Sequence, residues 1–257
     1  MTNGESPVSI CITSGKGGVG KTCLTINLAY SLAEKGRSVL VIDGDLGLAN
    51  VDVMLGLSVK RTIRDILEIG IDPLESVIYP KAKVGVLPAS SGVPEMVTLG
   101  PEEQDQLGGF LKSVMMHFDF VLIDTAAGIG PSVLWFNTFA EHNIIVLSPD
   151  PTSLTDAYAL IKVLSRDYGR KQFHIVPNLI RSEKEGTETF ETLNKTARKF
   201  LTLDLHCLGT IPEDGNVNKA IRQQIPLVQM VPKSKAARAV SFLAERIQEP
   251  GFINDMG

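Results

Sequence analysis

The sequence predicts an α/β fold in which a doubly wound, mostly parallel sheet carries helices on both faces. Short apolar runs alternate with amphipathic stretches along the 257 residues, which is the order of β-α-β units. Most of the apolar runs are continuous, as expected of strands buried on both faces of a parallel sheet. A glycine-rich turn follows the first run, and open α/β sheets bind ligands at such strand ends.

The elements follow in order from the two patterns. The apolar runs predict strands at Val8–Thr13, Ser38–Ile42, Val84–Leu87, Phe120–Asp124, Asn143–Ser148, Phe173–Pro177 and Leu208–Ile211. The amphipathic stretches predict helices at Thr22–Lys35, Arg61–Ile69, Pro101–Met116, Ser132–Ala140, Ser153–Asp167, Thr187–Leu201 and Ser234–Gln248. Gly36 stands where the first helix is expected to end. Because no proline- or serine-rich linker divides the chain, we expect one domain over residues 2–248 and a flexible tail over 249–257.

The composition excludes several classes of protein. The chain carries 25 basic and 29 acidic residues, a net charge of −4, and 44% of its residues are hydrophobic. It is therefore too apolar for a disordered protein and too acidic for a protein that coats nucleic acid. It has no signal peptide and no apolar run near the ~18 residues of a membrane span, so we expect a cytoplasmic protein. Cys11, Cys23 and Cys207 form no CxxC pair and are expected to be reduced core thiols.

The segment Gly15–Thr22 fits the phosphate-loop pattern G-x-x-x-x-G-K-[ST] between a strand and a helix. Its glycines let backbone N–H groups face a phosphate, and the helix N-terminus adds positive potential. Lys21 is expected to reach the β- and γ-phosphates, and the Thr22 hydroxyl to ligate Mg²⁺. Lys16 is either an exposed loop lysine or a cation that stabilises transition-state charge. The nucleotide-binding candidates here are Gly15, Lys16, Gly17, Gly18, Val19, Gly20, Lys21, Thr22 and Cys23.

Two further strand ends carry carboxylates. Asp45 is expected to hold Mg²⁺ through water and to orient the attacking water, whereas Asp43 could be only a helix cap. Asp124 ends an apolar strand, as a carboxylate of the magnesium shell does, with a cap before a turn as the alternative. Gly128 and Gly130 give the next loop freedom to move with the γ-phosphate. The catalytic candidates are thus Lys16, Lys21 and Asp45, and the metal ligands Thr22, Asp45 and Asp124.

Together these segments resemble the deviant-Walker-A ATPases, the MinD/ParA family of P-loop NTPases. The resemblance rests on the loop with its extra lysine at Lys16, on Asp43–Asp45 and on Asp124-Thr125, and it covers about residues 8–248. Two longer stretches, Asp45–Gly56 and Pro149–Lys162, resemble the flagellar-number branch of that family, FlhG/FleN, also called YlxH.

The resemblance implies an ATPase that uses ATP and Mg²⁺ and hydrolyses slowly. It also implies a cycle between a monomer, with ADP or no nucleotide, and an ATP-bound homodimer. In that dimer Lys16 reaches the partner's nucleotide, Asp156 holds this lysine, and Asp150 lies at the dimer contact. The residues implied beside the adenine are Asn178, Arg181, Pro212 and Glu213.

The implied partners are an FlhF-like GTPase, the flagellar C-ring or a transcription regulator, with recruitment to the cell pole or membrane. Two departures bear on this. Only Met1–Pro7 precedes the first strand, where relatives carry an FlhF-activating motif. Residues 236–248 are interpreted as the last core helix, and 252–257 are too few for a membrane-targeting helix. Both departures count against FlhF stimulation and against ATP-dependent membrane binding by this chain.

Three functions stay open on the sequence. The first is a regulatory ATPase that controls flagellar number or placement. The second is a ParA-type DNA-segregation or cargo-positioning ATPase that binds non-specific DNA, which the negative net charge makes the weaker reading. The third is a metabolic enzyme on the same loop, which would need a second substrate pocket.

Several surface and core features allow two readings each. The aromatic side chains Trp135, Phe136 and Phe139 are either core or a partner-facing patch. Two basic faces are either solvated surface or contacts to a phosphate backbone, and their residues are Lys195, Arg198, Lys199, Lys233, Lys235 and Arg238.

Overall fold

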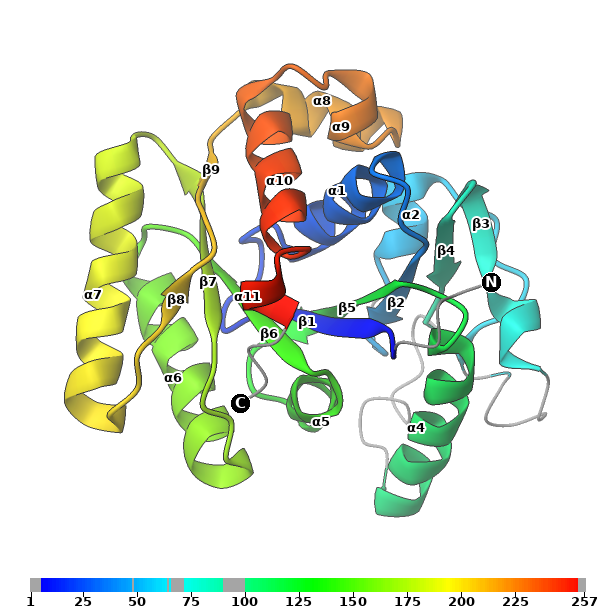
Figure 1. Cartoon of the computed structure of the whole chain (residues 1–257), viewed down its shortest axis with the longest axis horizontal. Helices are drawn as coiled ribbons and strands as arrows, with labels where there is room; N and C mark the ends of the chain where they lie inside the picture. Colours follow the sequence, from blue (N-terminus) through cyan, green and yellow to red (C-terminus); the bar gives the residue numbers. More distant parts are fainter. Residues whose placement is uncertain (1–5, 48, 64, 66–71, 90–99, 254–257) are drawn as a thin grey trace.

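A mostly parallel sheet forms the centre of the protein, as the sequence predicts (Figure 1). The computed structural model describes residues 6–47, 49–63, 65, 72–89 and 100–253. The strands are β1 (Val8–Ser14), β2 (Val39–Gly44), β3 (Ile78–Lys81), β4 (Val84–Leu87), β5 (Phe120–Ala127), β6 (His142–Leu147), β7 (His174–Ile180), β8 (His206–Cys207) and β9 (Ile211–Pro212). Their order is β3-β4-β2-β5-β1-β6-β7-β8, with β9 beside β7, and only the β3–β4 pair of the described strands is antiparallel.

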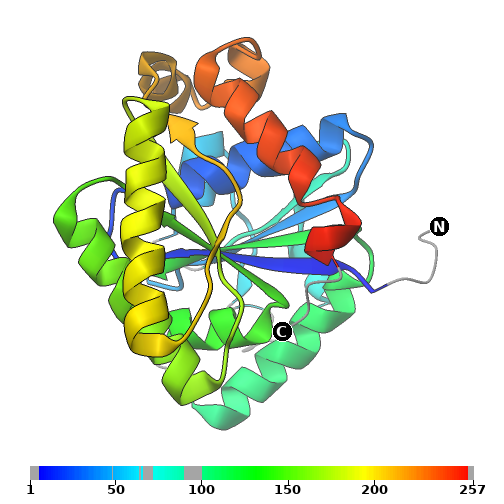
Figure 2. The ribbon, with the colours of Figure 1, turned by 60° about the vertical axis from the view of Figure 1, so that its left-hand side comes forward.

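Helices cover both faces of this sheet (Figure 2). They are α1 (Lys21–Glu34), α2 (Val51–Leu55), the 3₁₀ turn η1 (Pro73–Ser76), α4 (Pro101–Met115), α5 (Pro131–Phe139), α6 (Pro151–Tyr168), α7 (Glu183–Leu201), α8 (Gly215–Gln223), α9 (Leu227–Met230), α10 (Lys235–Arg246) and α11 (Pro250–Ile253). α1 and α10 pack on one face, and α4, α5, α6 and α7 pack on the other.

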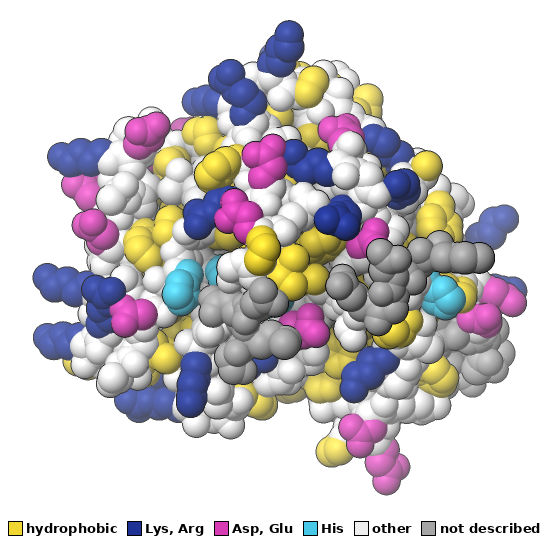
Figure 3. Space-filling model, in the orientation of Figure 1, with side chains coloured by type: hydrophobic (Ala, Val, Ile, Leu, Met, Phe, Trp, Pro, Cys, Tyr) yellow, Lys and Arg dark blue, Asp and Glu magenta, His cyan; other side chains and the backbone are white. Residues whose placement is uncertain are grey.

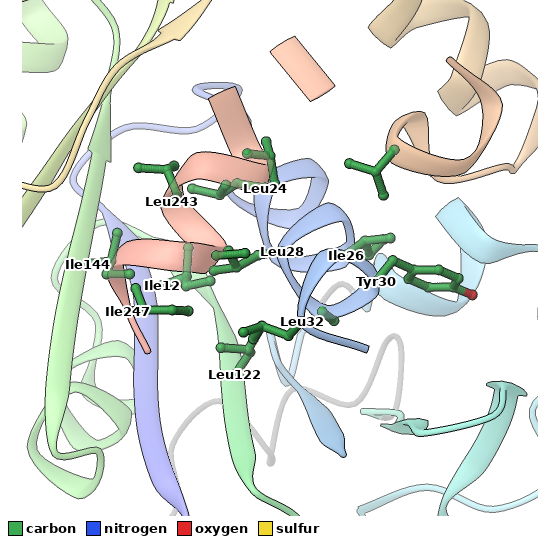
Figure 4. Packing of buried hydrophobic residues seen from close by; sticks show 14 of the residues in the cluster. Ile12, Leu24, Ile26, Leu28, Tyr30, Leu32, Leu122, Ile144, Leu243 and Ile247 are labelled. Carbon is green, nitrogen blue, oxygen red and sulfur yellow. The ribbon is translucent and has the colours of Figure 1, made fainter. Parts of the chain in front are cut away.

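α1 is buried on nearly all sides because it lies between the sheet and α10 (Figure 4). Leu28 and Leu32 face the strand residues Ile12 and Leu122, while Leu243 of α10 covers the helix from outside. A fully buried leucine contributes about 2 kcal/mol by its removal from water. This packing fixes the helix that begins at the phosphate loop.

Three elements differ from the expectation. α7 begins at Glu183 instead of Thr187, because the Ser182 side chain accepts the Glu185 N–H and caps the helix earlier. The predicted strand Leu208–Ile211 is not observed as one strand: β8 ends at Cys207, before the predicted range begins, and β9 starts at its last residue, Ile211. The elements α2, α8, α9, η1 and the antiparallel β3 were not predicted, and most of the predicted helix 61–69 lies outside the described residues.

The expectation of a flexible tail from residue 249 is wrong as far as Ile253. Residues 250–253 form α11, and Phe252 is only 5% exposed. Its ring lies 4.6 Å from that of His142 and 4.4 Å from that of His174, measured between ring centroids. Contact with the rings at the amino ends of β6 and β7 therefore holds α11 in place. The Pro250-Gly251 pair had predicted that the fold ends before this segment. Residues 254–257 lie outside the described part.

The aromatic cluster on α5 belongs to the core. Phe136 is fully buried, and Trp135 and Phe139 pack partly buried against the same hydrophobic cluster. Cys11 is also fully buried, and burial raises the pKa of its thiol. Among the described residues, no helix is both long enough and apolar enough to cross a membrane.

Candidate nucleotide-binding site

The predicted site residues gather at one edge of the sheet. β1 lies between β5 and β6, and β2 lies beside β5, all parallel. Their carboxyl ends therefore open on the same side, which brings the loop after β1 close to Asp45 and Asp124. The ends of β6 and β7 add the segments that begin at Ser148 and Asn178. The loop after β1 and the segments at the ends of β6 and β7 line a cavity of about 540 Å³ over the Gly17-Gly18 turn, and Asp45 and Asp124 are not among its lining residues.

The first glycine of the phosphate loop, Gly15, is required because the loop approaches the backbone of α6 closely there. A Cβ atom at Gly15 would lie 2.2 Å from the backbone carbonyl carbon and oxygen of Asp156. Gly20 has φ +95°, a conformation that side chains disfavour, and caps α1. In contrast, Gly17 and Gly18 have open space at their Cβ positions. The loop is thus anchored at its ends and open in the middle, where phosphate would bind.

Lys21 is prepared for a buried anion. The side chain is only 8% exposed, and Nζ donates a hydrogen bond of 2.9 Å to Ser14 Oγ. Ser14 Oγ in turn donates to the carbonyl oxygen of Lys16 at 2.7 Å. Burial lowers the pKa of Lys21. The role of Ser14 was missed because a serine before a glycine loop carries no sequence signal of its own.

Asp124 is buried within β5, three residues before the strand ends at Ala127, and lies next to the threonines of α1. Burial raises the pKa of Asp124 to about 6, while hydrogen bonds from the Thr22 and Thr25 hydroxyls and the charge of Lys21 lower it. Thr25 Oγ1 lies 3.2 Å from Asp124 Oδ1. A hydroxyl and a carboxylate side by side are hard oxygen ligands that suit Mg²⁺. Thr22 and Asp124 therefore fit the predicted metal position.

Asp43 and Asp45 have different surroundings although they are two residues apart. Asp43 is buried and accepts the N–H groups of Asp45, Asn50 and Val51, so it caps the beginning of α2. Burial, with the nearby charge of Asp124, raises the pKa of Asp43 to about 7. Asp45 is half-buried at the rim of the site, where a water-orienting carboxylate is expected. The alternative of a capping role for Asp43 is confirmed.

Lys16 is the exposed lysine of the loop. Its Nζ lies 2.9 Å from Asp150 Oδ1 and 2.6 Å from Thr152 Oγ1. Asp150 also caps α6 by accepting the Ser153 N–H, and bonds from the Ser148 and Thr152 hydroxyls together with that of Lys16 hold its pKa well below the usual range. In this structure Lys16 is held by Asp150, whereas the resemblance implied Asp156 for this role.

A second cavity of about 360 Å³ lies beyond the loop, between α1 and the segment from β9 to α10. Its walls are mostly apolar and include Cys23, Pro212 and Glu213 among the predicted residues. Asn178 also lines it, but its Nδ2 donates to the Val19 carbonyl oxygen at 2.7 Å and its Oδ1 accepts the Leu179 N–H. Asn178 thus ties the loop to β7. Arg181 and Glu213 are largely exposed, 3.8 Å apart.

A glycine-rich loop between β1 and α1, a buried lysine at its end and a hydroxyl–carboxylate pair beside it define a P-loop NTPase. The ParA family model, described as NUBPL iron-transfer P-loop NTPase, matches residues 7–248. The chain therefore belongs to the ParA/MinD family of P-loop NTPases, which uses ATP and Mg²⁺. The family resemblance found in the sequence is confirmed.

Individual relatives agree with this assignment. The chain is 42% identical to the antiactivator FleN of Pseudomonas aeruginosa, covering 93% of this chain and 85% of that protein. It is 35% identical to the flagellum site-determining protein YlxH of Helicobacter pylori, covering 91% and 80%. The structure of MinD from Pyrococcus furiosus has a TM-score of 0.79 and 29% identity, with 94% and 98% covered. That of MinD with Mg-ADP from Pyrococcus horikoshii has a TM-score of 0.78 and 30% identity, with 95% and 97% covered.

Proposed function

We propose that this chain is a slow, Mg²⁺-dependent regulatory ATPase that alternates between a monomer and an ATP-bound homodimer. It controls flagellar number or placement through partner proteins of the flagellar apparatus, and acts in the cytoplasm or where those partners recruit it. The observation that carries the proposal is the pair of loop lysines. Lys21 is buried at the end of the loop, whereas Lys16 lines the open cavity and is held there by an exchangeable ion pair with Asp150. Similarity to FleN and YlxH supports the flagellar role.

The chemistry follows from the positions of the side chains. Lys21 exchanges the Ser14 hydroxyl for the β- and γ-phosphate oxygens, while Thr22 and Asp124 hold Mg²⁺. Bound Mg²⁺ neutralises phosphate charge in the transition state. Asp45 orients the attacking water from the rim of the site. Stabilisation by positioned charges is the main source of catalysis in phosphoryl transfer, so these residues need little motion of their own.

Lys16 accounts for the dimer. To reach a nucleotide on a second protomer, Lys16 must leave Asp150 and Thr152. The Asp150 side chain is 41% exposed to water, and Thr152 is exposed. Exposed ion pairs contribute only about 0–1 kcal/mol, so this exchange costs little. Asp150 lines the cavity beside the loop, and the Asp156 backbone packs against Gly15 at the beginning of the loop. We place both residues at the dimer contact. The basic lysine then compensates charge at the partner's phosphates.

The loops that follow Asp45 and Asp124 are connected through the core. Gly44 approaches the ring of Phe136 so closely that a Cβ there would lie 3.0 Å from Cε2. Phe136 belongs to α5, the helix that follows the loop with Gly128 and Gly130. A change at the γ-phosphate side of either loop is therefore transmitted to α5, and we propose α5 and its loop as the element that reports nucleotide state to partners.

Light scattering of the full chain with Mg²⁺ and either ATP or ADP tests the proposal. Asp45→Ala removes the water-orienting carboxylate but leaves Lys21 and Asp124, so we expect this variant to dimerise with ATP and to stop hydrolysing it. Lys16→Ala is expected to bind ATP and remain a monomer. An Asp45→Ala protein that stays monomeric at saturating ATP and Mg²⁺ would contradict the dimer cycle.

A further inference from the structure

An unusually basic region lies on the side of the molecule that carries α8, α9 and the beginning of α10. We define the basic cap as residues 215–238. It contains five basic residues and neither aspartate nor glutamate, in a chain whose net charge is −4. The five are Lys219, Arg222, Lys233, Lys235 and Arg238. Figure 3 shows Lys and Arg side chains gathered along the top of the molecule, where α8 and the beginning of α10 lie in Figure 1.

The charges of the basic cap have no ion-pair partner among the described residues. All five side chains are exposed. None of them takes part in an ion pair in the part of the chain that the structure describes, although exposed lysines and arginines elsewhere do, such as Lys35 with Glu245 and Arg198 with Asp204. On α8, Lys219 and Arg222 are three residues apart and therefore lie on the same helix face. A cluster of like charges without acidic partners raises the local potential and attracts an acidic ligand.

Apolar side chains are exposed beside these charges. Ile221 is 37% exposed and Ile225 is 42% exposed, and Val53 of α2 is 62% exposed. Gln224 Nε2 donates to the Val53 carbonyl oxygen at 2.7 Å, and its side chain also lies against Gly56. The carboxyl end of α8 and α2 thus form one surface, on which aliphatic side chains alternate with cations.

This surface is connected to the nucleotide site. The basic cap forms the outer wall of the second cavity through Val217, Ile221, Leu227 and Ala236. Asp214 fixes the wall in place, because its carboxylate accepts the N–H groups of Asn216 and Ala236 at the beginnings of α8 and α10. Hydrogen bonding to these backbone groups lowers the pKa of Asp214 against the opposing effect of burial. A ligand on the outside of this wall and a nucleotide base on the inside would press on the same side chains.

We propose that the basic cap is a docking surface for an acidic protein segment that carries aliphatic side chains, and that this binding is coupled to the nucleotide. The charge of the cap selects an acidic partner. The aliphatic side chains select a protein over a nucleic acid, because a phosphodiester backbone would leave Ile225 and Val53 uncovered. Because the same wall bounds the second cavity, nucleotide and segment change each other's affinity by the same factor.

The test uses the full chain and three fluorescent probes, measured by anisotropy with ATP and with ADP. The first probe is a 20-residue peptide of glutamate and leucine with leucine at helical spacing, the second is polyglutamate of the same length and charge, and the third is a 20-base-pair DNA duplex. We expect the glutamate–leucine peptide to bind at least 5-fold more tightly than either of the others. We also expect its affinity to differ between ATP and ADP.

Variants assign the binding to the basic cap. Lys219→Ala/Arg222→Ala is expected to weaken peptide binding about 5- to 20-fold, and Ile225→Ser about 3- to 10-fold. Lys195→Ala/Lys199→Ala, on the separate basic surface of α7, removes the same charge and is the matched control with no expected effect. None of the substituted residues lines the cavity over the phosphate loop or the second cavity. ATP hydrolysis and ATP-dependent dimerisation are measured alongside, and both are expected to stay unchanged in all the variants.

Three outcomes would overturn the proposal. The first is DNA binding as tight as peptide binding and insensitive to Ile225→Ser, which would assign the surface to a phosphate backbone. The second is equal loss of binding in the α7 control. The third is the absence of peptide binding to a chain that hydrolyses ATP and dimerises normally. A chain that fails to dimerise but binds the peptide through the basic cap would contradict the proposed cycle and leave this inference standing.

Discussion

The two lysines of the phosphate loop are five residues apart and have opposite surroundings. Lys21 is buried, donates to the neutral Ser14 hydroxyl and lies near the charge of Asp124. Lys16 is exposed and pairs with Asp150 across the cavity opening. Burial disfavours the charged form of Lys21, so the protonated side chain is stabilised when an anion binds beside it. Solvent screens the ion pair between Lys16 and Asp150, so Lys16 can exchange this partner at little cost. The buried Lys21 is therefore suited to the phosphates bound in its own site, and Lys16 to a nucleotide bound by a second protomer.

The carboxylates around the two lysines follow the same division. Asp43 and Asp124 are buried, and burial raises the pKa of both, so each is stabilised by a cation or proton that joins it. Asp150 is exposed, and hydrogen bonds lower its pKa. The buried carboxylates of Asp43 and Asp124 therefore favour a bound cation or proton, whereas the carboxylate of Asp150 is already stabilised by its hydrogen bonds and by Lys16. Four substitutions test this division, from the largest expected effect to the smallest.

Removal of the buried lysine is expected to have the largest effect. Lys21→Ala takes away a charge-assisted contact to two phosphates, each contributing about 1.5–3 kcal/mol, which corresponds to a loss of at least about 100-fold in ATP affinity. Trp135, the one tryptophan of the chain, lies in α5 and serves as the fluorescence reporter. Lys35→Ala, which removes a surface ion pair with Glu245, is the control. Unchanged ATP affinity in Lys21→Ala would refute the assignment of the phosphate position.

Removal of the exposed lysine is expected to leave ATP affinity within about 3-fold and to reduce the hydrolysis rate. A cation supplied to the transition state from a second protomer accelerates phosphoryl transfer by about 10³–10⁵ in the best-studied cases, so Lys16→Ala should lose at least about 10-fold in a slow ATPase. The rate is measured over a range of protein concentrations. If Lys16→Ala kept the full hydrolysis rate, Lys16 would have no role in catalysis.

Substitution of the buried Asp43 is expected to lower stability by about 1–3 kcal/mol. Asp43→Asn keeps one oxygen but places an amide group against backbone N–H donors that the carboxylate now accepts. The pKa of Asp43 is raised from 3.8 to about 7 in the folded chain, so between these values the folded state binds more protons than the unfolded state. The free energy of unfolding therefore falls as pH rises from about 4 to 7.

Urea unfolding at pH 5 and pH 7.5, without Mg²⁺ or nucleotide, measures both effects. Asp43→Asn should lose part of this pH dependence, whereas Asp119→Asn, a part-buried acceptor far from the site, should retain it. A stability that rises over the same pH interval in the unsubstituted chain would show that the buried carboxylates are not responsible.

Substitution of Asp150 is expected to have the smallest effect on stability. Asp150→Ser retains an oxygen that can cap α6 and removes the ion pair with Lys16, together with the carboxylate's hydrogen bonds from the Ser148 and Thr152 hydroxyls. The expected change in the free energy of unfolding is below about 1 kcal/mol. Asp150→Ala, which also removes the cap, should cost about 0.5–2 kcal/mol. Thermal unfolding of both variants separates the ion pair from the cap, and equal losses would show that the cap contributes nothing.

Much of the site could be predicted because it depends on local sequence. The phosphate loop is contiguous, and Asp45 and Asp124 each follow closely on a run of apolar residues, so the parallel packing of β2 and β5 brings them to one edge. Ser14 and Thr25 escaped prediction because their hydroxyls matter only through contacts with Lys21 and Asp124. The assignment of Asn178 to the adenine side stays a prediction: the residue lines the second cavity, and its amide also donates to the Val19 carbonyl oxygen. That second contact could not be predicted, because a side chain's partner depends on the packing of distant strands.

The sequence by itself determined the class of fold, the phosphate loop and the family, because hydrophobic periodicity and glycine positions are local properties of the chain. Only the tertiary structure decided which lysine is buried, that Lys16 is paired with Asp150 in place of Asp156, and that Phe252 docks onto the sheet. It also left the five cations of the basic cap exposed, with no ion pair to any acidic residue that the structure describes. Burial and charge pairing arise between segments far apart in sequence, and these contacts exist only once the sheet has assembled.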